Sequence, residues 1–171
     1  MPFSQTLLPE FEQEMKNTRK LLECIPDGKL DTRPHPRSMT LAQLATHVAQ
    51  VPGWTKYLLD EEVLDLSPGM KPLVVASKAE LLDIFDQGVL EARGRIGAAS
   101  DDYWQTTWTF KIGGETVFSM PRAAVMRSTI MNLLIHHRAQ LGVYLRLHEV
   151  PIPGMYAPSA DDKPLQTAQA A

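Results

Sequence analysis

Apolar residues recur at intervals of three and four along four long stretches of this chain, which is the spacing of helices that bury one face. The first stretch covers residues 3–23, and a Pro-Asp-Gly turn ends it. The second begins after Thr40, which can form a capping box with Gln43. Pro52–Gly53 interrupts this second stretch, so we predict a kink before it resumes over residues 54–59.

Two further helices and one hairpin follow from the same kind of pattern. The third stretch covers residues 77–96 and opens with a second predicted capping box, formed by Ser77 and Glu80. The fourth covers residues 121–147, roughly 40 Å of helix. Between them, residues 108–112 and 116–120 alternate in character around Gly113–Gly114, which predicts a β-hairpin.

These elements predict an all-α protein. Four amphipathic segments with short connections are typical of a four-helix bundle, here with the small β-hairpin inserted before the last long helix. We assign residues 1–150 to this bundle, which is long enough to bury a substantial core. Residues 151–171 form an extended tail that contains several prolines, and its last ten residues have a composition typical of disorder.

Composition and charge exclude several classes of function. The net charge of -3 and the pI near 5.9 argue against a nucleic-acid-binding surface. No apolar run approaches the roughly 18 residues of a membrane helix, and the first residues do not resemble a secretory signal. Cys24 is the only cysteine, so no intrachain disulfide can form. Together these features favour a cytoplasmic protein.

His137 is the strongest candidate for chemistry because it lies in an apolar stripe of the last predicted helix. The stripe places eight side chains on one face: Met126, Ile130, Leu133, Leu134, His137, Leu141, Tyr144 and Leu145. Such a face is normally buried, and a buried imidazole needs a hydrogen bond, an ion or another ring as its partner. His47 lies in a similar apolar setting on the second predicted helix. Two inward histidines on two helices raise the possibility of a metal site inside the bundle.

The usual ligand spacing of a helical metal site is incomplete here. A catalytic zinc takes three protein ligands, and two of them often lie four residues apart on one helix. The residue four positions before His137 is Leu133. The neighbouring His136 points about 100° away from His137 and aligns with a polar ridge, so we interpret it as a flanking residue. His47 and His137 are therefore either a two-ligand metal site or two core histidines that their neighbours satisfy.

Two other side chains lie near these histidines in the predicted elements. Trp54 follows the predicted kink, where it can either line the mouth of a pocket or pack in the core. Arg138 is expected off the apolar face, either paired with Asp161 or Asp162 of the tail or in contact with water. The sequence contains no Gly-x-Ser-x-Gly nucleophile elbow, so no hydrolytic nucleophile is indicated.

Two helical stretches and the tail resemble one known family. Residues 131–146, with the core His-His-Arg-Ala-Gln-Leu, resemble the last helix of the DinB/YfiT-like superfamily. Residues 38–54 resemble its second helix, and residues 150–161 resemble the tail of one of its branches. The resemblance covers nearly the whole chain, and it implies a four-helix bundle of the DinB/YfiT type that is often a homodimer.

The same resemblance implies a metal site and a type of reaction. Family members hold a divalent metal, commonly zinc or nickel, with three histidines, and two of these positions fall on His47 and His137. The third falls on Leu133, where this chain departs from the pattern, so we expect zinc or nickel to bind weakly or to be absent. Characterised relatives include thiol-dependent transferases and isomerases, and many other members have no established activity.

Two functions are therefore open. The first is a metal-dependent thiol transferase or isomerase that acts on a small thiol or another small molecule. In it, His47 and His137 bind the ion, while Trp54, Leu133 and His136 line the pocket. The alternative is a degenerate, metal-free DinB-like bundle that serves as a binding or dimerisation module. In both cases we expect a homodimer that binds neither nucleic acid nor membranes.

Overall fold

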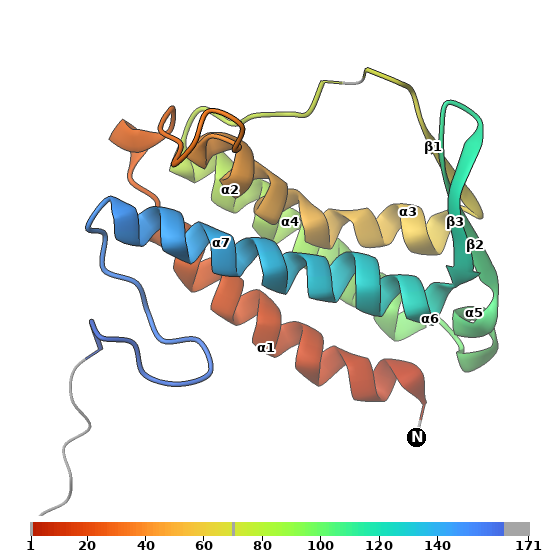
Figure 1. The fold of residues 1–171 in the computed structure, drawn as a ribbon. Helices are drawn as coiled ribbons and strands as arrows, with labels where there is room; N and C mark the ends of the chain where they lie inside the picture. The colour runs from red at the N-terminus through yellow and green to blue at the C-terminus, as the bar shows by residue number, and fades with distance from the viewer. Residues whose placement is uncertain (1, 70, 163–171) are drawn as a thin grey trace, which may run out of the picture.

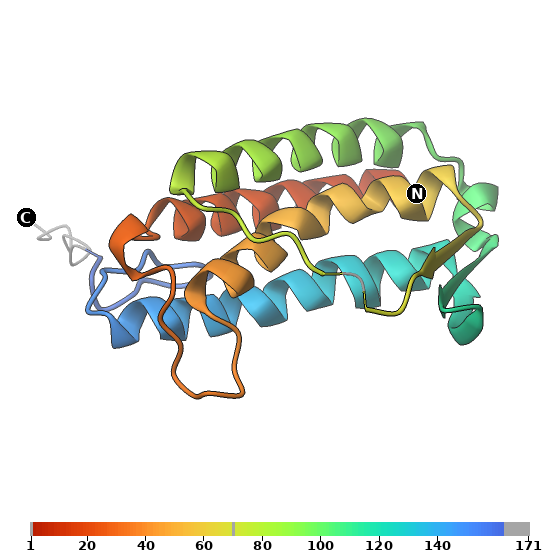
Figure 2. The same ribbon diagram turned by 90° about the horizontal axis from the view of Figure 1, so that it is seen from above.

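The protein is mostly helical, with one three-stranded sheet at one end (Figure 1). The computed structural model describes residues 2–69 and 71–162. Its long helical segments are α1 (Phe3–Glu23), the run α2 (Leu41–Gln50), η2 (Val51–Trp54) and α3 (Thr55–Asp60), then α4 (Lys78–Ala98), and finally α7 (Leu133–Leu147). Each packs on two neighbours, so that α1, α4, α2 and α7 surround a common core. Figure 2 shows α4 along one flank of the molecule and α7 along the other. Within the described residues, no helix is long and apolar enough to cross a membrane.

Local signals set the starts of the helices. Before α2, the Thr40 hydroxyl accepts the Gln43 amide N–H at 3.1 Å, and the Gln43 carboxamide oxygen accepts the Thr40 N–H at 2.7 Å, which completes the predicted capping box. Before α4, Ser77 accepts the Glu80 N–H at 3.2 Å. The Glu80 carboxylate, however, binds the N–H of Ala76 rather than that of Ser77, so only half of the second box forms.

The break at Pro52–Gly53 is a short 3₁₀ turn, η2, that packs tightly on α4. A Cβ atom on Gly88 of α4 would lie 2.9 Å from the backbone nitrogen of Gly53 and 3.2 Å from its Cα. Only glycine lets the two backbones approach this closely. The sequence pattern predicted the kink from Pro52 and gave no indication of its partner in α4. This contact fixes the turn that carries Trp54.

The last long helix is continuous but not uniformly α-helical. After α6 (Arg122–Val125), seven residues form a π-helical stretch, η3 (Met126–Asn132), before α7 begins. A π-helix has more residues per turn than an α-helix, so it rotates the faces on either side of it relative to each other. The predicted stripe is therefore only partly fully buried. Met126, Ile130, Leu134, Leu141 and Leu145 are buried, whereas Leu133, His137 and Tyr144 lie at its edge and are only half-buried.

A small sheet caps the end of the molecule beside α5 (Asp101–Gln105). Strands β2 (Thr107–Ile112) and β3 (Glu115–Pro121) pair antiparallel around Gly113–Gly114, whose φ angles of 60° and 86° suit glycine. A third strand, β1 (Val63–Leu66), pairs parallel with β2, and the sequence pattern did not predict it. The strand is only four residues long, and its third residue is the charged Asp65. In the structure, Asp65 accepts the N–H of Gly114 and ties β1 to the turn.

The tail folds back onto the helices. The Asn17 side chain of α1 donates to the Met155 carbonyl at 3.2 Å, and Arg146 of α7 forms an ion pair with Asp161. Residues up to 162 are thus anchored at several points. Residues 163–171, on which most of the expected disorder falls, lie outside the described residues.

Candidate metal site

The structure brings His47 and His137 together at the contact between α2 and α7. Their ring centroids are 4.5 Å apart, and the ring planes are nearly perpendicular at 89°. His47 lies in the second half of α2, and His137 lies one turn into α7. Both side chains are half-buried. For His137 the reason is the phase shift in η3, which moves it away from the fully buried face. The two rings therefore meet at the border of the core rather than in its dry centre.

Two more aromatic rings extend this pair on either side. Trp54 lies edge-on to His47, with centroids 5.2 Å apart, and is half-buried. His136 lies 5.0 Å from His137 and is exposed, in line with its assignment as a flanking residue. The result is a row of four rings, Trp54, His47, His137 and His136, that runs from the η2 turn to solvent.

Gln140 orients His137, a role that the sequence reasoning missed. Its carboxamide oxygen lies 2.8 Å from Nδ1 of His137, one turn along the same helix. With that oxygen as acceptor, Nδ1 carries the hydrogen and Nε2 keeps the lone pair that a metal or a proton needs. The i, i+3 spacing of His and Gln on one helix was the available signal.

Burial keeps His47 in its neutral form. The pKa of His47 lies below its ordinary value of 6.5, chiefly because burial penalises the charged ring and also because His137 is close by. A neutral imidazole is the form that binds a metal ion. At neutral pH, His47 is thus ready to act as a ligand without first losing a proton.

The spacing of the two rings is compatible with two positions of a metal shell. Two imidazoles that share a tetrahedral zinc, at roughly 2.0–2.1 Å per Zn–N bond, bring their ring centroids to about 5 Å. The observed 4.5 Å is close to that value. The third ligand position that the family resemblance implies falls on Leu133, whose half-buried hydrocarbon side chain packs against the core and cannot donate electrons to a metal. Within residues 2–69 and 71–162, no group of three or more His, Cys, Asp or Glu residues is placed to hold an ion.

Arg138, the neighbour of His137, is buried, which corrects the expectation that it meets the tail carboxylates or water. Its side chain is only 3% exposed and forms an ion pair with Glu14 of α1 at 2.6 Å. It also donates to Thr18 Oγ1 at 3.1 Å and to the Tyr156 hydroxyl at 2.5 Å. The tail carboxylate Asp161 pairs with Arg146 instead.

The sequence held a signal for this buried pair. Glu14 occupies a position of the apolar stripe of α1, three residues after Phe11 and four before Thr18, where a carboxylate needs a buried cation. The pair joins α1 to α7 directly beside His137. It thereby fixes the position of the helix that presents the imidazole.

Comparisons with known proteins agree with this fold. A model of the DinB family matches residues 1–167. A DinB-like protein from Bacillus cereus is 21% identical, with a TM-score of 0.67 over 91% of this chain and 98% of its own. A DinB-like protein from Bacillus subtilis is 13% identical, with a TM-score of 0.65 over 88% and 97% of the two chains.

A third solved structure, from Exiguobacterium sibiricum and described as a putative member of the DinB family, is 20% identical, with a TM-score of 0.60 over 90% of this chain and 97% of that one. No curated protein matches the chain. At these identities the solved structures support the fold alone, while the family model spans almost the whole sequence. The chain belongs to the DinB family.

Proposed function

We propose that this protein is a metal-dependent enzyme of the thiol transferase or isomerase type, built on a four-helix bundle of the DinB type, with His47 and His137 as its metal ligands. The observation that supports the proposal most directly is the perpendicular imidazole pair, with centroids 4.5 Å apart. The rings come from two different helices, so an ion between them would link α2 to α7.

Each neighbouring residue has a distinct role in this proposal. Gln140 holds His137 so that its Nε2 is free, and Trp54 shields one side of His47 from water. Arg138 and Glu14 hold α7 against α1 and so position His137. A bound zinc or nickel ion would supply a Lewis acid that lowers the pKa of a coordinated thiol.

Leu133 shapes the type of ligand that this site accepts. With two protein ligands, a tetrahedral ion keeps two positions for water or for a substrate. Leu133 adds an apolar wall to the side on which the family has its third ligand. We therefore propose a small thiol with an apolar portion as the substrate class, and a lower metal affinity than a three-histidine site provides.

The second candidate is a metal-free DinB-like bundle that acts as a binding or dimerisation module. The packing of Leu133 against the core favours it. So do the ring contacts of His47, because edge-to-face packing on Trp54 and His137 stabilises a neutral imidazole without an ion.

Metal binding separates the two candidates. Protein purified without chelator and without a nickel column should bind one Zn²⁺ or Ni²⁺ per chain in calorimetry, and the ion should raise the melting temperature. The variants His47→Ala and His137→Ala should lose this binding, whereas the exposed neighbour variant His136→Ala should keep it. Absence of binding in the natural chain, or equal binding in all three variants, would favour the metal-free module.

Two further measurements sharpen the result. Leu133→His restores the family ligand, so it should increase metal affinity by orders of magnitude if the rest of the site is intact. Co²⁺-loaded protein should develop a sulfur-to-cobalt charge-transfer band when 2-mercaptoethanol is added. If the metal binds but no such band appears, the metal site stands and the thiol substrate is wrong.

A further inference from the structure

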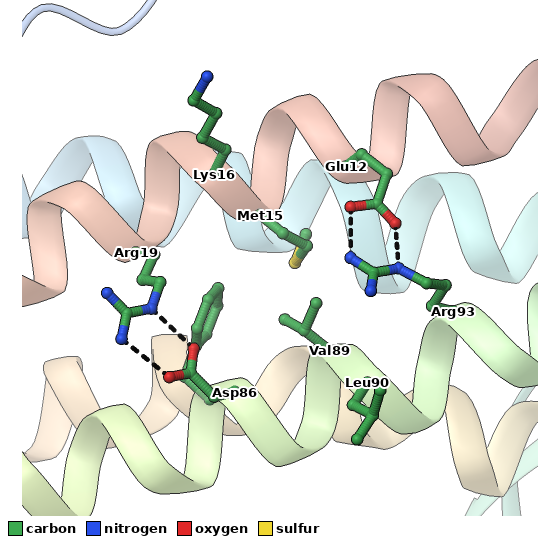
Figure 3. Close-up of a pocket in the computed structure, with 9 residues that line it drawn as sticks. Glu12, Met15, Lys16, Arg19, Asp86, Val89, Leu90 and Arg93 are labelled. Carbon is green, nitrogen blue, oxygen red and sulfur yellow. Dashed lines mark hydrogen bonds and ion pairs between the residues drawn. The ribbon is translucent and has the colours of Figure 1, made fainter.

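Two pockets on the described surface differ in whether their charged groups are already paired. The larger has a volume of about 410 Å³ and lies between α1 and α4. Figure 3 shows two ion pairs across it, Glu12 with Arg93 and Arg19 with Asp86. These carboxylates and guanidinium groups satisfy one another, so the smaller pocket is the better candidate for a ligand.

The smaller pocket has a volume of about 120 Å³ and lies where the loop before α2 meets the end of α7. In Figure 2 this loop crosses the last turns of α7. The lining consists of Arg33 and Pro34 from the loop and of Tyr144, Leu147 and His148 from the end of the helix. Sites for drug-sized ligands have roughly 300–1,000 Å³, so this pocket suits a molecule of only a few atoms.

Hydrogen bonds hold the loop against α7 on both sides of Arg33 and Pro34 in the sequence. The Tyr144 hydroxyl donates to the Met39 carbonyl at 3.1 Å, and the His148 ring lies 2.6 Å from the Thr32 hydroxyl. The walls are therefore in place before a ligand arrives, which lowers the cost of binding.

Arg33 brings a cation without an acidic partner to the pocket. Among the residues that the structure describes, no carboxylate forms an ion pair with it, and its guanidinium donates to the Pro36 carbonyl at 3.4 Å. A guanidinium has five N–H donors, so most of them remain available. Its planar fork matches the two oxygens of a carboxylate, which is therefore the group that Arg33 suits best.

His148 adds a hydrogen-bond acceptor. The Thr32 hydroxyl donates its single hydrogen to the Lys29 carbonyl at 2.6 Å, so it can only accept from His148. Nε2 of His148 therefore carries the hydrogen, and Nδ1 of the neutral ring keeps its lone pair. No described residue donates to this Nδ1. The atom is also open to solvent, because within the described chain only Thr55 Oγ1 is a fully buried side-chain polar atom without a partner.

The remaining walls favour a short carbon chain. Pro34 and Leu147 line the pocket, and the Leu147 side chain is 62% exposed, so a bound alkyl group would remove apolar surface from water. The donor that meets Nδ1 of His148 is better a hydroxyl than an ammonium group. The reason is the positive charge of Arg33 and of Arg37 on the same loop, which repels a second cation.

We propose that this pocket binds a small hydroxycarboxylate. The carboxylate pairs with the Arg33 guanidinium, the hydroxyl donates to Nδ1 of His148, and the carbon chain packs on Leu147 and Pro34. The pocket is separate from the candidate metal site, because none of its residues belongs to that site and Tyr144 lies two helical turns, about 10 Å, beyond His137.

A titration with lactate, followed by two-dimensional amide NMR at constant ionic strength, tests the proposal. In the natural chain, saturable shifts should appear around Arg33 and at the end of α7, with a dissociation constant in the millimolar range. Arg33→Gln should bind lactate at least tenfold more weakly. The matched control is Arg37→Gln, which lies on the same exposed loop outside the pocket lining and should bind as the natural chain does. Absence of saturable shifts in the natural chain, or equal binding by Arg33→Gln, would overturn the proposal.

A comparison of ligands tests the role of the hydroxyl. Propionate has the same carbon chain and lacks the hydroxyl, so it should bind about three- to tenfold more weakly than the better enantiomer of lactate. In His148→Phe this preference should disappear, and the NMR spectrum itself checks that the variant is folded. If propionate, the amino acid alanine or inorganic phosphate binds the natural chain as tightly as lactate, the assignment of a hydroxycarboxylate is wrong.

Discussion

The buried ion pair between Arg138 and Glu14 provides the sharpest test of how the helices are held together. Both side chains are almost fully buried, and their closest atoms are 2.6 Å apart. In Arg138→Met the Glu14 carboxylate would stay buried and, among the residues that the structure describes, keep only the Tyr156 hydroxyl, at 2.8 and 2.9 Å, as a hydrogen-bond donor. Breaking one partner of a buried pair in this way costs about 3–5 kcal/mol.

The double variant Arg138→Met with Glu14→Leu should recover most of this loss. Replacing both charges by apolar groups removes the cost of burying them, and such replacements are often neutral or stabilising. For a chain of this length, the single variant should melt roughly 6–20 °C lower than the natural chain. Urea unfolding followed by circular dichroism gives all four corners of the cycle.

The reasoning would be refuted by either of two results. One is a single variant that loses less than about 1 kcal/mol, the value expected of an exposed pair. The other is a double variant as unstable as Arg138→Met, which would show that the arginine acts through its size and its contact with Tyr156 rather than through its charge.

Three further predictions concern backbone packing and titration. Gly88→Ala should destabilise the protein by about 1–3 kcal/mol, because the added Cβ meets the Gly53 backbone. The control Gly94→Ala lies in the same helix and has open space around the added Cβ, so it should stabilise the protein by about 0.5–1 kcal/mol. Burial and the Glu14 hydrogen bond raise the pKa of Tyr156, so the contribution of this residue to stability is present below pH 10 and is lost as the pH rises further. In urea unfolding, the stability difference between the natural chain and Tyr156→Phe should therefore shrink between pH 9 and pH 11. A constant difference would contradict this. Burial, with a smaller effect from Glu23, raises the pKa of the Cys24 thiol, so less of the reactive thiolate is present at pH 8. Mass spectrometry should therefore show slower alkylation of Cys24 by iodoacetamide than of a free cysteine. An equal rate would contradict this.

The helical part of the fold could be predicted from local patterns. The stripe of α1, the capping box of Thr40 and the break at Pro52 depend on residues close together in the sequence. Strand β1 could not be found in this way, because four residues carry little periodicity and their partner lies more than forty positions further on, in β2. Its pairing depends on the tertiary structure.

The two histidines of the candidate site could be predicted from the sequence, but their depth of burial and the neighbouring ion pair could not. The apolar settings of His47 and His137 indicated that both rings point inward, and the structure places them in contact. The π-helical stretch η3 changed how deeply His137 is buried, and an α-helical period cannot anticipate such a change of phase. The same shift turned Arg138 toward Glu14, a pairing between residues more than a hundred positions apart.

The central claim is that His47 and His137 can share one metal ion. X-ray absorption spectroscopy on the zinc-loaded protein tests it most directly, because scattering from imidazole rings reports how many histidines bind the ion. The account predicts two imidazoles with Zn–N distances of about 2.0–2.1 Å, and a single imidazole in His137→Ala. A spectrum without imidazole scattering, or one that His137→Ala leaves unchanged, would contradict it.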